Sequence, residues 1–152
     1  MRKTYKGIIG IDFKLPDNGI FVFGSNSHGR HGKGSALTAK LKYGAIYGRA
    51  TGFQGRSYAI CTKNLTKTTH PSVSKEYITD QIIILYNFVS CTGKEYEYYI
   101  AYKGSGINLN AYSPEEMAEM FAINYSMYYE EIPKNIIFEE EFGELVKKYC
   151  KI

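Results

Sequence analysis

The segment Gly29-Arg30-His31-Gly32-Lys33-Gly34-Ser35 carries the residue types that hold a phosphate group. Glycines let a phosphate approach the backbone closely, and N–H groups at a helix N-terminus add donors and the positive end of the helix dipole. The P-loop pattern G-x-x-x-x-G-K-[ST] does not fit because Gly34 follows Lys33, and the pattern G-x-G-x-x-G lacks its third glycine at Leu37. The segment therefore predicts an anion site, whereas hydrolysis of ATP or GTP by a P-loop is not indicated.

A second glycine cluster, Gly104-Ser105-Gly106, follows an apolar run later in the chain. Ligands of open α/β sheets bind beyond the carboxyl ends of the strands, so this loop and the loop at Asn26–Ser35 are expected to converge. His28 and His31 lie three residues apart in the first of these loops, but no carboxylate or third histidine is close in the sequence. We therefore predict neither a metal site nor a cofactor.

The elements that must position these loops alternate between strand and helix. Short apolar runs predict strands at 19–24, 57–62, 96–102 and 135–138. Helical spacing and cap residues predict helices at 33–42, at 72–87 with Ser72 as N-cap, from Ser113 onward, and at 141–149. This alternation predicts an α/β domain with a mainly parallel sheet covered on both faces.

Composition limits the class of protein. With 152 residues, 44% of them hydrophobic and 22% charged, the chain is expected to form one globular domain over residues 1–152. Cys61, Cys91 and Cys150 form no C-x-x-C pair, so a reducing compartment, the cytoplasm, is expected. No window approaches the roughly 20 apolar residues of a membrane span, and no apolar run follows the charged N-terminus, so no membrane association is predicted.

A net charge of +4 and 15 tyrosines keep a nucleic-acid-binding module open as a second class. Tyr43, Tyr47, Phe53 and Tyr58 have the types needed to stack a base, and their spacing fits core packing equally well. The basic residues gather at loops after predicted strands rather than across one face, which argues against nucleic acid as the partner. A purely structural protein would leave the loop glycines unused.

Three blocks of the chain, in order, resemble the macrodomain family. Phe23-Gly24-Ser25-Asn26 followed by His31-Gly32-Lys33-Gly34-Ser35-Ala36 is similar to that family's strand ending in Asn and its glycine-rich helix start. Tyr58-Ala59-Ile60-Cys61-Thr62-Lys63 is similar to the strand-Thr-Lys segment of the terminal ADP-ribose glycohydrolase branch. Lys103-Gly104-Ser105-Gly106-Ile107-Asn108 resembles the later G-x-G-hydrophobic-Asp loop of that branch.

The resemblance implies a three-layer α/β/α macrodomain-like fold with a pocket for ADP-ribose or a related NAD-derived nucleotide. The ligand-binding residues that it implies are Gly24, Ser25, Asn26, Gly32, Lys33, Gly34, Ser35, Ala36, Thr62, Gly104, Ser105, Gly106 and Ile107. Compact versions of the glycine block resemble phage proteins, which implies capture of a host-defence signal in the host cytoplasm. The sequence does not indicate an oligomeric state.

The resemblance also implies a catalytic pair, which is only half present in this chain. In the glycohydrolase branch, the lysine that matches Lys63 attacks the anomeric carbon of the ribose, and the Asp of the later loop assists by proton transfer. Asn108 stands at the position of that Asp, and an amide is neither a general acid nor a general base. Asn108 therefore favours binding without turnover, and catalysis by Lys63 stays open.

Overall fold

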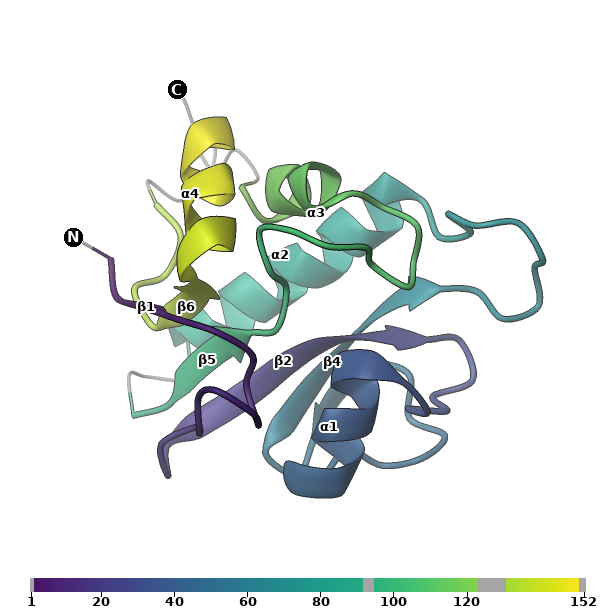
Figure 1. Ribbon diagram of the computed structural model, residues 1–152, viewed down its shortest axis with the longest axis horizontal. Coiled ribbons are helices and arrows are strands. Elements are labelled where there is room, and N and C mark those ends of the chain that lie inside the picture. The colour runs from purple at the N-terminus through teal and green to yellow at the C-terminus, as the bar shows by residue number, and fades with distance from the viewer. Residues whose placement is uncertain (1, 92–94, 123–130, 151–152) are drawn as a thin grey trace.

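In a computed structural model of the protein, the described residues are 2–91, 95–122 and 131–150, and their strands form one sheet. The strands are β1 (Thr4–Tyr5), β2 (Gly19–Asn26), β3 (Gly52–Gln54), β4 (Ser57–Lys63), β5 (Glu97–Ile100) and β6 (Ile136–Glu139). Their order in the sheet is β1-β6-β5-β2-β4-β3 (Figure 1). Each neighbouring pair in this order is parallel except β4 and β3, which are antiparallel.

Helices cover both faces of this sheet. They are α1 (Gly34–Lys42), α2 (Lys75–Cys91), α3 (Pro114–Phe121) and α4 (Glu140–Tyr149), and Figure 1 shows α1 below the sheet and the other three above it. Side chains alternate along β2, because Ile20 and Val22 belong to the core with α2, α3 and α4, whereas Phe21 and Phe23 pack with α1. The predicted three-layer α/β/α fold with a mixed, mainly parallel sheet is confirmed.

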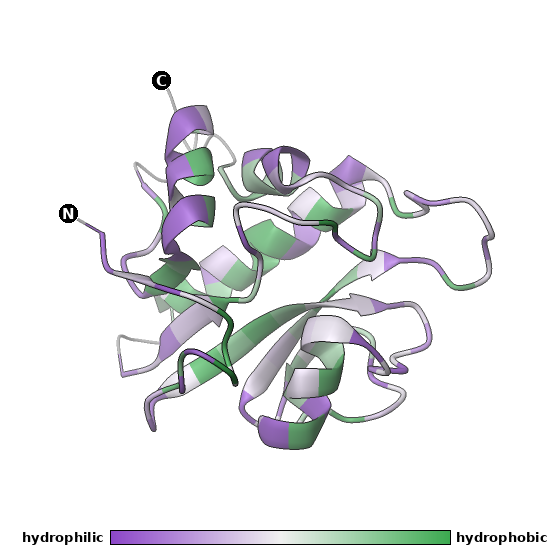
Figure 2. Cartoon of the chain, viewed as in Figure 1, coloured by the Kyte–Doolittle hydropathy of each residue, from purple (hydrophilic) through white to green (hydrophobic). Residues whose placement is uncertain are grey.

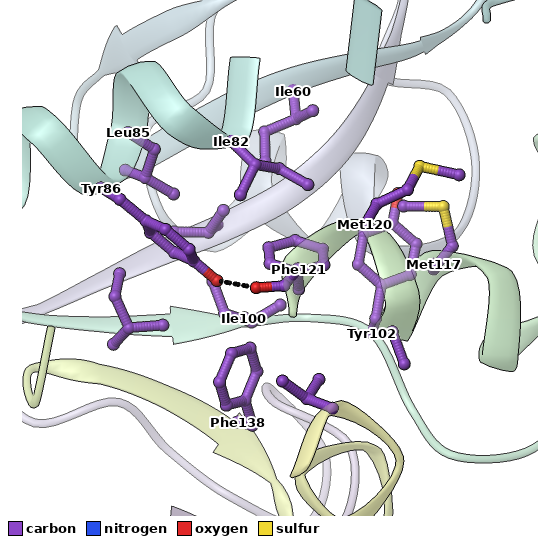
Figure 3. Close-up of a cluster of buried hydrophobic side chains, with 14 of the residues drawn as sticks. Ile60, Ile82, Leu85, Tyr86, Ile100, Tyr102, Met117, Met120, Phe121 and Phe138 are labelled. Carbon is purple, nitrogen blue, oxygen red and sulfur yellow. Dashed lines mark hydrogen bonds between the residues drawn. The ribbon is translucent and has the colours of Figure 1, made fainter. Parts of the chain in front are cut away.

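The larger core lies between the sheet and the three helices on one face (Figure 3). Tyr86 of α2 donates a 2.8 Å hydrogen bond to the carbonyl oxygen of Phe121, so this buried hydroxyl is satisfied. Phe138 of β6 meets the Phe121 ring edge-on, with ring centroids 5.9 Å apart. Figure 2 shows apolar residues along the central strands and hydrophilic residues on the outer side of α4.

The predicted helix starts are partly right. Ser113 forms the expected capping box, because its side chain accepts from the Glu116 N–H while the Glu116 side chain accepts from the Ser113 N–H. The predicted N-cap Ser72 is wrong. Ser74 accepts the Tyr77 N–H at the start of α2, whereas the Ser72 hydroxyl accepts the N–H of Asn64 at 2.8 Å. The Ser72 side chain therefore accepts from the residue that follows β4, and Ser74 caps the helix instead.

The predicted strands are all present, with shifted ends. The run at 96–102 becomes the shorter β5, and the run at 19–24 extends to Asn26. The short strands β1 and β3 were missed, because two or three residues are too few to show an alternating pattern. Among the described residues, no helix is both long enough and apolar enough to span a bilayer.

Candidate functional site at the carboxyl ends of the strands

A pocket of about 750 Å³ lies beyond the carboxyl ends of β2, β4 and β5. Four segments line it: the chain after β1, the end of β2 with the start of α1, the end of β4, and the loop after β5. Its volume is within the usual range for small-molecule sites. The two glycine-rich loops therefore converge on one pocket, as the strand directions predicted.

Almost all of the predicted site residues line this pocket. They are Gly24, Ser25, Asn26, Gly32, Lys33, Gly34, Ser35, Ala36, Thr62, Ser105, Gly106 and Ile107, together with Lys63 and Asn108. Gly104 is not part of the lining. Its N–H donates to the Glu139 carboxylate at 3.1 Å, and a Cβ on Gly104 would lie 2.5 Å from the Cβ of Glu141. The absence of a side chain at Gly104 thus permits close packing on the start of α4.

Gly24 also has a packing reason to be glycine. A Cβ at this position would collide with the hydroxyl of Tyr102, which lies at the pocket beside Thr62. The Tyr102 hydroxyl interacts with Thr62 and accepts a 3.5 Å hydrogen bond from Asn110. Burial raises the pKa of Tyr102 to about 12, so the hydroxyl stays protonated and neutral at physiological pH.

Four basic side chains, Arg30, Lys33, Lys63 and Lys103, line the pocket. Within the described part of the chain, no Asp or Glu lines it, and none of the four forms an ion pair. Uncompensated positive charge around a concave site raises the local concentration of anions and favours their binding. The charge distribution therefore fits an anionic ligand.

Backbone N–H groups add to this positive character. Lys33 is the N-cap of α1 and makes no side-chain cap, and the first intrahelical bond runs from the Leu37 N–H to the Lys33 carbonyl. Among the described residues, the N–H groups of residues 34–36 and of residues 105–109 have no protein acceptor. Free N–H groups at a helix start form an anion-binding arrangement. Both loops that line the pocket thus carry N–H donors that no described protein group uses.

The predicted catalytic pair lines the pocket without a carboxylate. Lys63 is half-buried at the end of β4, and its backbone carbonyl accepts the N–H of Ser27 at 2.9 Å. The side chain of Asn108 donates a 2.9 Å hydrogen bond to the carbonyl oxygen of Tyr112. The amide nitrogen of Asn108 is therefore already used in a hydrogen bond within its own loop. The described lining offers no carboxyl group for proton transfer.

Other residues that the sequence singled out lie outside the pocket. His31 is fully buried next to the first loop, whereas His28 is exposed. Tyr43 and Tyr58 are buried core residues, which favours the packing interpretation over base stacking. No cluster of three or more His, Cys, Asp or Glu side chains in the described ranges is arranged to hold a metal ion.

Part of the pocket wall was missed by sequence reasoning. Aliphatic side chains from the chain after β1 and from other loops line it, namely Ile8, Ile9, Ile11, Leu65 and Leu109. Of these, Ile11 is 79% exposed and Leu109 is 58% exposed. The only signal in the sequence was apolar residues in segments otherwise typical of loops. The pocket therefore combines a basic, amide-rich part with an aliphatic part.

Comparisons with known proteins identify no relative of this chain. No family model matches it, and neither a curated protein nor a solved structure shows significant similarity.

Proposed function

We propose that this protein binds ADP-ribose or a related NAD-derived nucleotide in the pocket between its two glycine-rich loops. The observation that carries the proposal is the charge of the described lining, which has four basic side chains and no carboxylate. A diphosphate combines two negative charges with several acceptor oxygens. It suits both the cations and the free N–H groups of residues 34–36 and 105–109.

The rest of such a ligand matches the rest of the wall. Ribose hydroxyls need polar partners, and the described structure leaves Nδ2 of Asn26 and Oδ1 of Asn108 unused at the pocket. A heterocyclic base needs apolar surface, which Ile8, Ile9 and the other aliphatic residues offer. The choice of ADP-ribose among diphosphates rests on the resemblance to macrodomains.

Binding without turnover is the form of this function that we favour. Transfer of the ADP-ribosyl group to a lysine needs an acid to assist the leaving group and a base to complete hydrolysis. Asn108 supplies neither, and no carboxyl group lines the described pocket. A protein of this kind would sequester its ligand, as a phage counter-defence protein acting in the host cytoplasm would.

Calorimetric titration with ADP-ribose, cyclic ADP-ribose, NAD, ATP and inorganic pyrophosphate tests the proposal. Each ligand is then recovered and analysed by chromatography. We expect tight binding of an ADP-ribose relative and its recovery intact. Recovery of a cleaved product would make Lys63 a nucleophile. Failure of every nucleotide to bind, with salt-sensitive binding of single-stranded DNA instead, would overturn the proposal in favour of a nucleic-acid-binding module.

A further inference from the structure

His31 is a buried polar residue that does not line the candidate pocket. Its exposed fraction is 0%, and its ring meets Phe23 edge-on at a centroid distance of 5.2 Å. Its φ of 47° is in the left-handed region, where the chain turns just before the free N–H groups at the start of α1. The conformation and contacts of His31 therefore influence where those groups point.

The partner of His31 is Gln54, the last residue of β3, with 3.1 Å between Nε2 and Oε1. Three backbone contacts fix the orientation of this glutamine amide. Its Oε1 accepts the Ile46 N–H at 2.8 Å, and its Nε2 donates to the carbonyl oxygens of Arg49 and Gly52. Because Oε1 can only accept, His31 must carry its proton on Nε2 to form this hydrogen bond.

The other imidazole nitrogen shows that His31 does more than fill space in the core. Nδ1 of His31 is buried and has no partner among the described residues. A buried acceptor without a donor costs free energy, and a phenyl ring would fill the same space without that cost. What the imidazole adds is the hydrogen bond from Nε2 to Gln54.

A second connection joins the same two segments. The N–H of Gly48 donates to the Gly29 carbonyl at 2.8 Å, and a Cβ on Gly29 would lie 2.5 Å from the backbone nitrogen of Arg49. The segment at 26–33 thus lies directly on the segment at 44–54. The hydrogen bond between His31 and Gln54 closes this contact at the end nearer to α1.

We propose that His31 is a positioning residue of the candidate site, which through Gln54 holds residues 32–36 in the geometry that binds the ligand's diphosphate. The inference rests on the proposed function. It assigns to His31 no contact with the ligand, since His31 does not line the pocket. Its effect is to fix the loop in advance, so that less ordering is required when the ligand binds.

Three substitutions separate positioning from filling space. His31→Gln keeps a donor at the position of Nε2, His31→Phe keeps the ring but removes the donor, and His31→Asn tolerates the left-handed backbone but is too short to reach Gln54. Val146→Ala, at a buried position of α4, is a control for lost stability outside the pocket. Each variant is titrated with ADP-ribose and with inorganic pyrophosphate, and backbone order parameters of residues 28–34 are measured by NMR without ligand.

We expect His31→Gln to bind both ligands nearly as well as the unaltered protein. His31→Phe and His31→Asn should lose about tenfold for both ligands, the equivalent of one hydrogen bond, and should show lower order parameters. Val146→Ala should change neither property. Unaltered affinity in His31→Phe would overturn the inference, whatever its order parameters.

The two proposals fail in different ways. If the unaltered protein binds no nucleotide and no pyrophosphate, the proposed function fails, and the role of His31 in a diphosphate site fails with it. If the unaltered protein binds ADP-ribose but His31→Phe binds it equally well, only the inference about His31 fails.

Discussion

The two loops that form the pocket are held in very different ways. In the first loop, residues 26–33, Asn26 Oδ1 accepts the N–H groups of His28 and Arg30, and further bonds fix Gly29 and His31 to the segment at 44–54. In the second loop, residues 104–110, the hydrogen bonds lie at the two ends, from Gly104 to Glu139 and at Asn108 and Asn110, whereas residues 105–107 make none within the described structure. Between these points lies Ile107, whose exposed fraction is 96%.

This difference indicates that the two loops contribute to ligand binding in different ways. A loop whose polar groups are already paired offers its free donors in one arrangement, so it contributes affinity without further ordering. A loop with few contacts opens locally at a low free-energy cost, so its conformation can adapt to the ligand. We therefore expect selectivity for the diphosphate to depend on the first loop, and adjustment to the rest of the ligand to depend on the second.

The largest expected effect comes from placing a carboxylate in each loop region. Gly34→Glu should weaken ADP-ribose binding by more than about 100-fold, because a like charge beside a diphosphate costs several kcal/mol and the φ of 58° at Gly34 adds backbone strain at the start of α1. Gly106→Glu should cost only about tenfold, because the second loop can turn the new side chain outward. Calorimetric titration measures both.

A matched control exists for these two variants. Gly34 and Gly106 both have positive φ, 58° and 96°, so Gly34→Gln and Gly106→Gln carry the same backbone strain as the Glu variants without the charge. Each Gln variant should therefore lose less affinity than its Glu counterpart. Equal losses in Gly34→Glu and Gly106→Glu would contradict the proposed difference between the loops.

A smaller effect, on the free energy of unfolding, is expected where the two chain segments that lead into the loops contact each other. Gly24 lies in β2, which leads into the first loop, and Tyr102 leads into the second. Gly24→Ala should lower the free energy of unfolding by about 1–3 kcal/mol, because its Cβ collides with the Tyr102 hydroxyl. The double variant with Tyr102→Phe should recover most of this loss, since the colliding oxygen is gone. Urea denaturation of the two single variants and the double variant gives the coupling, and purely additive losses would refute the contact.

The smallest effect tests the fixed end of the second loop. Asn108→Asp replaces the donor to the Tyr112 carbonyl by an acceptor, so the free energy of unfolding should fall by about 1 kcal/mol at neutral pH. A carboxyl group held near a carbonyl oxygen has a raised pKa in the folded state. The protonated form can donate again, so stability should return as the pH falls and be lost as it rises through the folded pKa. Asn108→Ala should lose a similar amount at every pH, and a pH-independent loss in Asn108→Asp would count against this account.

The parts of the fold that local patterns determine could be predicted. The apolar runs of β2, β4 and β6 are long enough to be distinctive, and the capping box at Ser113 involves only its own turn. The choice between Ser72 and Ser74 as N-cap could not be predicted, because both are good caps and a contact with Asn64 decides it.

The candidate site shows the same limit. Convergence of the glycine-rich loops follows from the direction of parallel strands, so it could be predicted. The reasons for Gly24 and Gly104 could not, because the groups that require them, the Tyr102 hydroxyl and the start of α4, come from distant parts of the sequence. The hydrogen bond between His31 and Gln54 joins residues 23 positions apart and leaves no local pattern.

The two outermost strands have a consequence for how the molecule behaves among copies of itself. The described sheet ends in β1, with two residues, and in β3, with three. A free strand edge is a template on which another chain can add by backbone hydrogen bonding, and short edge strands are one way in which proteins limit such aggregation. The longest strands, β2 and β4, are neighbours in the interior of the sheet, where their backbone groups are already paired. The strand order thus leaves β2 and β4, the longest strands, without a free edge on which another chain could add. These two strands also lead into the pocket.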